Sequence, residues 1–170
     1  VRLPWRVSDD YGVASLKAEL RLDARPDAEP IGVTIPLPGG VPKTATGASQ
    51  QDLTAHPWAG LPVRATLIGR DAAGQTGTSE TQILTLPERP FQHPIARALI
   101  ELRKGLSLHP DDRSEALAGL DILMLQRDFF ANDPGGYVNL SAIYYLLVRQ
   151  KGIAVIPDAQ ERMWLLALHM

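Results

Sequence analysis

Two acidic turns are the places in this chain where residue types and spacing could support chemistry. Asp9 and Asp10 stand side by side two residues before Gly12, in the stretch SDDYGV, and Asp71 precedes Gly74 in a second turn. Paired carboxylates serve as general acids and bases, and oxygen-rich loops bind calcium. An aspartate also hydrogen-bonds the backbone two residues on, and glycine adopts positive φ in turns. The second stretch has no dense series of carboxylates like a calcium loop. We interpret both stretches as structural turns, with a metal at Asp9 and Asp10 as the alternative for the first.

The histidines and nucleophiles add no catalytic signature. None of His56, His93, His109 and His169 has the spacing of a metal-binding helix, and the first three each precede a proline, which favours extended or helix-entry positions. The chain has no cysteine and no GxSxG elbow. We therefore predict no catalytic residue, no metal and no cofactor.

A pocket that gathers two or more of a set of acidic residues and histidines, with perturbed pKa values, would contradict that prediction and favour an enzyme. The residues that would form such a cluster are Asp9, Asp10, His56, Asp71, Glu88 and His93.

Aromatic side chains leave a second function open. Trp5, Tyr11 and Trp58 lie in the strand-rich part of the chain, where exposed rings stack on sugars and buried rings fill a core. We favour burial. The alternative is a glycan- or cell-wall-binding or processing accessory domain, with aromatic or acidic residues in a cleft between two domains.

Composition limits the class of protein. The 170 residues are 45% apolar and carry a formal net charge of −2, with acidic and basic residues balanced. This balance does not favour a nucleic-acid partner, and the lack of cysteine excludes disulfides. No run approaches the roughly 20 apolar residues that span a bilayer. We expect this stretch to be soluble and to meet a membrane only through segments outside it.

Hydrophobic periodicity divides the chain into a β domain over residues 1–87 and a helical domain over 88–170. Residues before the division alternate with period two, and six or seven short strands separated by turns predict an immunoglobulin-like or fibronectin-like sandwich. The expected strands cover residues 3–7, 13–22, 31–37, 50–55, 62–71 and 81–86, and residues 37–50 are expected to form a long exposed loop.

Beyond the division, the spacing predicts about four helices. Pro94 marks the start of the first and Gly105 its end, and Asn139 is expected to cap the third. Capping pairs predict the starts of the second and fourth helices. The expected helices cover residues 93–105, 111–130, 139–152 and 157–170, with capping pairs Asp112 with Glu115 and Asp158 with Glu161.

Both ends of the sequence indicate an internal fragment of a longer protein, with the helical domain truncated. Val1 begins in strand-like sequence, and the chain stops inside an apolar helical run. In that run the apolar side chains from residue 163 to 168, among them Trp164, Leu165 and Leu168, surround the whole helix, so we expect another surface to cover part of it.

Four stretches, DDYGV, DLTAHPWAGLPV, DAAGQTGTSE and above all LPERPFQHPIARALIELRK, resemble a domain-of-unknown-function family of large, membrane-anchored alphaproteobacterial proteins. The resemblance covers most of the chain. It implies membrane helices near the N-terminus of the intact protein, a soluble region at the periplasmic face of the inner membrane, and a low-complexity C-terminal part. It supplies no catalytic residues.

These observations together predict a non-catalytic interaction or scaffolding module of a membrane-anchored cell-envelope protein. The expected partners are the rest of its own longer chain, a second copy in a homodimer, or another envelope protein. Asp9, Asp10 and Gly12 are assigned to a structural turn, and Trp164, Leu165 and Leu168 to the interaction.

Overall fold

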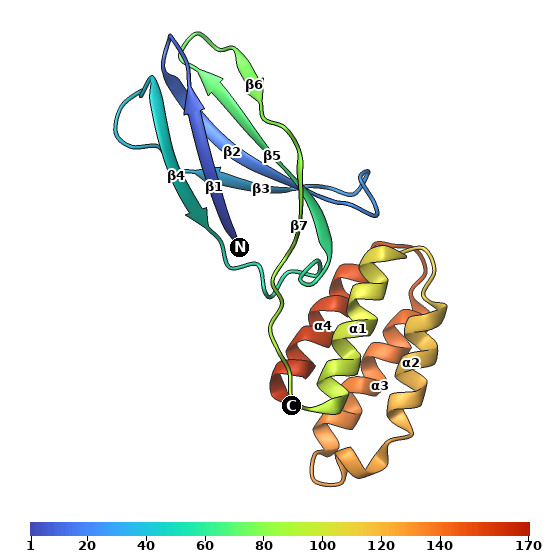
Figure 1. The fold of residues 1–170 in the computed structure, drawn as a ribbon. Coiled ribbons are helices and arrows are strands. Elements are labelled where there is room, and N and C mark those ends of the chain that lie inside the picture. The colour runs from blue at the N-terminus through green and yellow to red at the C-terminus, as the bar shows by residue number, and fades with distance from the viewer. The chain divides into compact units, whose positions relative to one another are not determined.

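The computed structural model describes all residues, 1–170, as strands followed by helices (Figure 1). The strands are β1 (Arg2–Ser8), β2 (Val13–Leu22), β3 (Ile31–Ile35), β4 (Thr44–Gln50), β5 (Pro62–Asp71), β6 (Thr76–Thr78) and β7 (Gln82–Thr85). The helices are α1 (Pro94–Leu108), α2 (Ser114–Met124), the 3-10 turn η1 (Arg127–Phe130), α3 (Pro134–Arg149) and α4 (Ile156–His169). The predicted order, a sheet region followed by four helices, is confirmed.

The chain forms two compact units. The first contains Val1–Thr54 and Trp58–Glu88, and the second contains Ala55–Pro57 and Arg89–Met170. The second unit is therefore discontinuous in sequence, because it takes three residues from the segment between β4 and β5.

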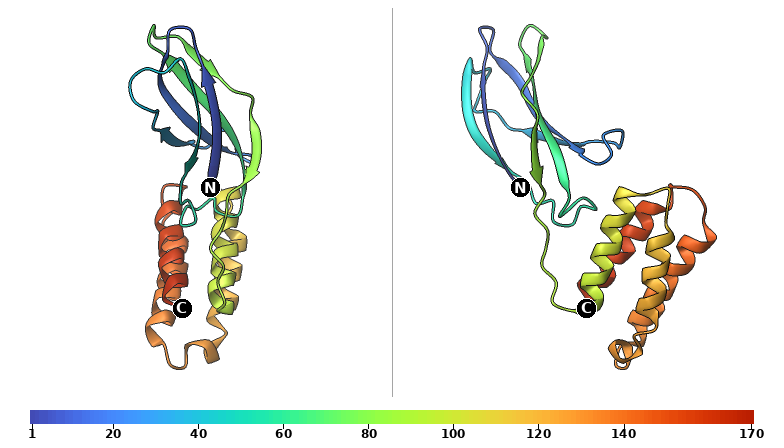
Figure 2. Two further views of the ribbon diagram at one scale, coloured as in Figure 1. Left: turned by 60° about the vertical axis from the view of Figure 1, so that its left-hand side comes forward. Right: turned by 45° about the vertical axis from the view of Figure 1, so that its right-hand side comes forward.

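Two antiparallel sheets form the two layers of the first unit (Figure 2). β1 pairs with β4 in one layer, and β3, β2 and β5 lie side by side in the other. β6 and β7 both pair with β5, at successive positions along it. The predicted alternation of β2 is confirmed, since Leu16, Ala18, Leu20 and Leu22 are all buried. An apolar face on each layer explains why the layers form a shared core.

β4 corrects the sequence prediction, because it lies inside the expected exposed loop of residues 37–50. Its residues, TATGASQ, are too small and polar to give a clear strand signal. They suit this place because Trp5 covers the strand: a Cβ on Gly47 would lie 2.8 Å from Trp5 Cζ2. The short strand expected at residues 50–55 is wrong; Gln51 follows β4 and no strand forms before Pro62.

The four helices of the second unit form a closed ring of neighbours. α1 packs against α2 and α4, and α3 packs against the same two helices. The core between them is built from aliphatic side chains; its fully buried members include Leu99, Leu120, Leu140, Leu147 and Met163. The apolar faces predicted from helical spacing therefore point inward.

The predicted start of the third helix is wrong, since α3 begins five residues before Asn139. Asp133 is the N-cap, its Oδ1 accepts a hydrogen bond from the amide of Gly136 at 2.9 Å, and Pro134 occupies the first helical position. Proline suits this position because its missing N–H would have no helical partner there. The stretch DPGGYVN, which resembles a connection, is thus the first turns of a helix.

Other helix boundaries also differ from the prediction. α1 continues through Gly105 to Leu108, where the amide of His109 donates to the Gly105 carbonyl. α2 ends at Met124 instead of residue 130, and the following 3-10 turn places Phe130 in the core. The capping pairs of α2 and α4 do not form as predicted. Asp112 Oδ1 accepts a hydrogen bond from the amide of Ser114 at 3.1 Å instead of the amide of Glu115, and the N-cap residue of α4 makes no side-chain cap hydrogen bond.

Candidate functional site

The fold brings the two acidic turns of the sequence together. Val13 lies opposite Asp71 in the register of β2 and β5, and the amide of Ala72 donates to the carbonyl of Gly12 at 3.1 Å. The two turns are about 60 residues apart in sequence, so their contact depends on strand pairing. They form one end of the first unit.

The first turn is held by Asp9. Its Oδ2 accepts a hydrogen bond from the amide of Tyr11 at 2.8 Å, and its carbonyl accepts one from Gly12 at 3.2 Å. Gly12 is buried with φ of 86°, a conformation that favours glycine. Asp10 is exposed and makes neither hydrogen bond.

The second turn is held by Asp71. Its Oδ1 accepts a hydrogen bond from the amide of Gln75 at 2.7 Å, and its carbonyl accepts one from the amide of Gly74 at 3.1 Å. The other carboxylate oxygen, Oδ2, is buried and has no hydrogen-bond partner, in a side chain that is 7% exposed. A buried polar atom without a partner is uncommon in folded proteins and marks this position.

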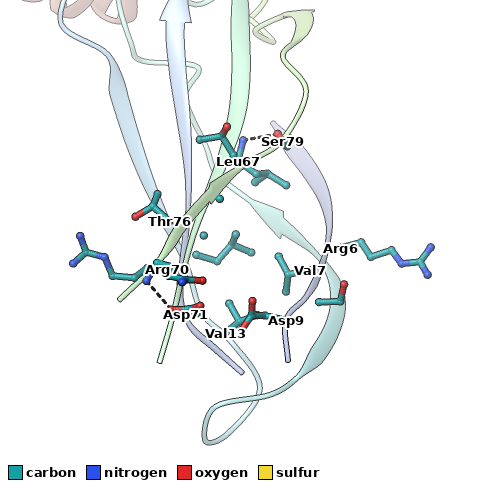
Figure 3. Close-up of a pocket in the computed structure, with 15 residues that line it drawn as sticks. Arg6, Val7, Asp9, Val13, Leu67, Arg70, Asp71, Thr76 and Ser79 are labelled. Carbon is teal, nitrogen blue, oxygen red and sulfur yellow. Dashed lines mark hydrogen bonds between the residues drawn. The ribbon is translucent and has the colours of Figure 1, made fainter. Parts of the chain in front are cut away.

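A cavity of about 350 Å³ joins the two turns (Figure 3). Asp9 and Asp71 both line it, at the same end in Figure 3, whereas Asp10 does not. The fold thus brings two of the residues whose clustering would favour an enzyme, Asp9 and Asp71, into this cavity. No group of three or more histidine, cysteine or acidic residues in the structure is arranged to hold a metal ion.

His56 and His93 belong to the helical unit. His93 is the N-cap of α1, and its Nδ1 accepts a hydrogen bond from the amide of Ile95 at 3.1 Å. Burial lowers the pKa of His56, and the nearby positive charge of Arg103 lowers it further. His56 is therefore held in its neutral form near pH 7.

Arg103 is a buried cation of the helical unit whose guanidinium is hydrogen-bonded to backbone carbonyls. It is 3% exposed, and its guanidinium donates to the carbonyls of Gln160 at 3.1 Å, His56 at 3.4 Å and Ala55 at 2.5 Å. The ring of Trp164 lies 5.0 Å from the guanidinium carbon. Burial lowers the pKa of Arg103.

The burial of Arg103 was not predicted, although the sequence holds a signal for it. Arg103 follows Leu99 by four residues and precedes Leu106 by three, so it stands on the apolar stripe of an amphipathic helix. A charged residue on such a stripe indicates a buried, hydrogen-bonded group. The partners could not be predicted, because two of them come from residues 55–57.

The aromatic residues considered for sugar stacking separate into two groups. Trp5 and Trp58 are buried, as we favoured, whereas Tyr11 is 67% exposed. Of these three rings, Tyr11 is the one whose face is accessible for stacking on a ligand.

The predicted interaction residues lie on α4. Trp164 is half-buried, and its ring meets that of Phe91 edge-on at 5.7 Å between centroids. Leu165 and Leu168 are 55% and 39% exposed, whereas Met163, on the opposite side of the same helix, is fully buried. None of the four helices is long and apolar enough to cross a lipid bilayer.

Comparison with known proteins identifies one family. The model of a domain of unknown function (DUF4175) matches residues 1–170, which is the whole chain. No curated protein and no solved structure is significantly similar to the chain.

Proposed function

The chain belongs to the DUF4175 family over all of its 170 residues, and we propose that it serves as a non-catalytic interaction module of a cell-envelope protein. The proposal includes an immunoglobulin-like or fibronectin-like arrangement for the two layered sheets. It also includes membrane anchoring through other segments of an alphaproteobacterial protein, with this region at the periplasmic face of the inner membrane; the resemblance of the junction stretch from Leu86 to Lys104 supports that part.

The observation that carries the proposal is the outer side of α4. Glu161, Leu165 and Leu168 follow one another at helical spacing on the exposed side, opposite the buried Met163 and Leu166. Exposure of adjacent leucine side chains to water is unfavourable. Burying them against another apolar surface lowers the free energy.

The size of this surface indicates the kind of partner. Complete burial of one leucine side chain contributes roughly 1.5–3 kcal/mol, and both leucines here are already partly covered. A symmetric dimer would bury two leucines from each copy, for a gain of roughly 3–6 kcal/mol because each is about half exposed, which is less than the roughly 8 kcal/mol of a micromolar dimer. A partner that is linked to the same chain, or one that adds further contacts around these leucines, fits this surface best.

The test is sedimentation velocity of the 170-residue protein over a range of concentrations. Because these leucines are too few for a micromolar dimer, we expect wild type to self-associate only weakly, well above micromolar concentration, and Leu165→Glu with Leu168→Glu to stay a monomer at every concentration. The control is Leu125→Glu, because Leu125 is also exposed in the helical unit, at 72%, but lies just after α2. A wild-type monomer at all concentrations, or equal effects of the α4 and Leu125 changes, would exclude this face as a self-association surface.

A glycan-binding accessory domain is a second proposal. The supporting observation is Tyr11, an exposed ring two residues from a carboxylate that lines the cavity. Co-sedimentation with insoluble peptidoglycan tests it. Binding that is lost in Tyr11→Ala supports the proposal, and failure of wild type to co-sediment contradicts it.

A further inference from the structure

The cavity between the two acidic turns has the size and walls of a small-ligand site. Its volume of about 350 Å³ lies at the lower end of the range for ligand pockets. Val7, Val13, Leu16 and Leu67 supply apolar walls. A ligand that fills it would need a short apolar body.

The charges around the cavity select the sign of that ligand. Arg6 and Arg70 stand at its margin, but their side chains are exposed and extend away from it (Figure 3). Asp9 and Asp71 stay at the cavity without an ion-pair partner among the salt bridges of the structure. The lining groups therefore favour a positively charged hydrogen-bond donor.

Asp71 gives the site its polar anchor. Its Oδ1 is already used by the turn, and its Oδ2 is buried without any donor. Leaving a carboxylate oxygen unsatisfied in a buried place costs free energy, and an N–H donor from a ligand would remove that cost.

We propose that this cavity binds a small organic cation, an alkylammonium group, whose nitrogen donates to Asp71 Oδ2 while its hydrocarbon chain packs against the apolar walls. Asp9, at the same end of the cavity, adds a second negative charge. The Oδ2 atom has almost no exposed surface, so the turn from Ala72 to Gln75, whose residues are exposed, must shift slightly to admit the nitrogen.

A calcium ion suits the cavity less well than an alkylammonium group. Calcium takes six to eight oxygen ligands, usually with several carboxylates. Here two carboxylates line the cavity, and one oxygen of each already accepts a backbone amide. The apolar walls supply no ligand atoms for a metal ion, whereas they can pack against a hydrocarbon chain.

Isothermal titration calorimetry of the 170-residue protein tests the proposal at pH 7 and constant ionic strength, with three probes. These are n-pentylamine, the neutral analogue 1-pentanol and calcium chloride. We expect n-pentylamine to bind at least tenfold more tightly than 1-pentanol. Asp71→Asn should weaken amine binding at least tenfold, because it removes the charge and retains the size of the side chain.

The matched control is Asp10→Asn, since Asp10 is in the same turn as Asp9 but does not line the cavity. Its amine affinity should stay within twofold of wild type. If Asp71→Asn does not fold, as judged by circular dichroism, Asp9→Asn takes its place, with an expected weakening of threefold or more. Equal binding of amine and alcohol, equal effects of the control and cavity variants, or binding of calcium alone would overturn the proposal.

Discussion

Replacing Gly12 by alanine tests the packing of the first acidic turn. Gly12 has φ of 86°, where an L-residue is strained by roughly 1–2 kcal/mol. The site is also crowded: a Cβ would lie 2.6 Å from Val41 Cγ1 and 2.8 Å from the Val41 carbonyl oxygen. The half-exposed Val41 side chain can rotate away, but the backbone oxygen can move only with its segment.

That movement has a cost that can be estimated. The next two carbonyls, of Pro42 and Lys43, accept hydrogen bonds from the amides of Val13 and Asp9, each at 2.7 Å. Weakening one of them costs about 1 kcal/mol. Added to the backbone strain, the expected loss for Gly12→Ala is about 2–3 kcal/mol.

Gly74→Ala is the control, because Gly74 has the same φ of 86° but no heavy atom within 4 Å of a Cβ. It should show the strain alone, about 1–2 kcal/mol. Urea unfolding followed by tryptophan fluorescence measures both, in a Trp164→Phe background so that Trp5 and Trp58 report on the first unit. If Gly12→Ala is no more destabilising than Gly74→Ala, the Val41 carbonyl does not resist a Cβ at position 12.

Three further predictions concern the helical unit. Arg103→Met should destabilise it by about 2–4 kcal/mol in urea unfolding, because the buried carbonyls that Arg103 serves lose their donor; a loss below 1 kcal/mol would contradict this. The pKa of His56 lies below its ordinary value of 6.5, so the unfolded chain binds more protons and stability should fall as pH drops below 6.5. His56→Gln should flatten that fall, and an unchanged profile would refute it. Gly105→Ala should raise the melting temperature, since a Cβ meets nothing within 4 Å and alanine favours a helix, whereas Gly119→Ala should lower it because its Cβ would lie 2.5 Å from Leu102 Cδ2. Equal shifts would show that Leu102 moves aside freely.

The strands and helices that could be predicted are those whose pattern lies within a short stretch of the sequence. The alternation of residues 13–22 arises because one face of β2 is buried, and Pro94 marks the start of α1 because its fixed φ suits the first helical turn. β4 gave no such signal. Its small residues make sense only beneath Trp5, which lies about 40 residues earlier in the chain.

The cavity could not be predicted from the sequence either, because it depends on residues that are distant in the chain. Each acidic turn was recognisable by itself, from aspartate and glycine at turn spacing. That Asp9 and Asp71 line one cavity follows from the register of β2 with β5, and the unpartnered oxygen of Asp71 follows from burial; neither property is encoded within a few residues. The burial of Arg103 could be inferred from its helix stripe, but its carbonyl partners could not.

Residues 55–57 affect how the two units can be separated or exchanged at the level of the gene. The helical unit is completed by a tripeptide encoded more than 30 residues before the rest of it, and the carbonyls of Ala55 and His56 are partners of a buried cation. No single cut in the gene yields both units with all of their residues. A crossover near residue 88 would therefore deliver a helical cassette without its tripeptide, so the two units should be exchanged between genes as one block.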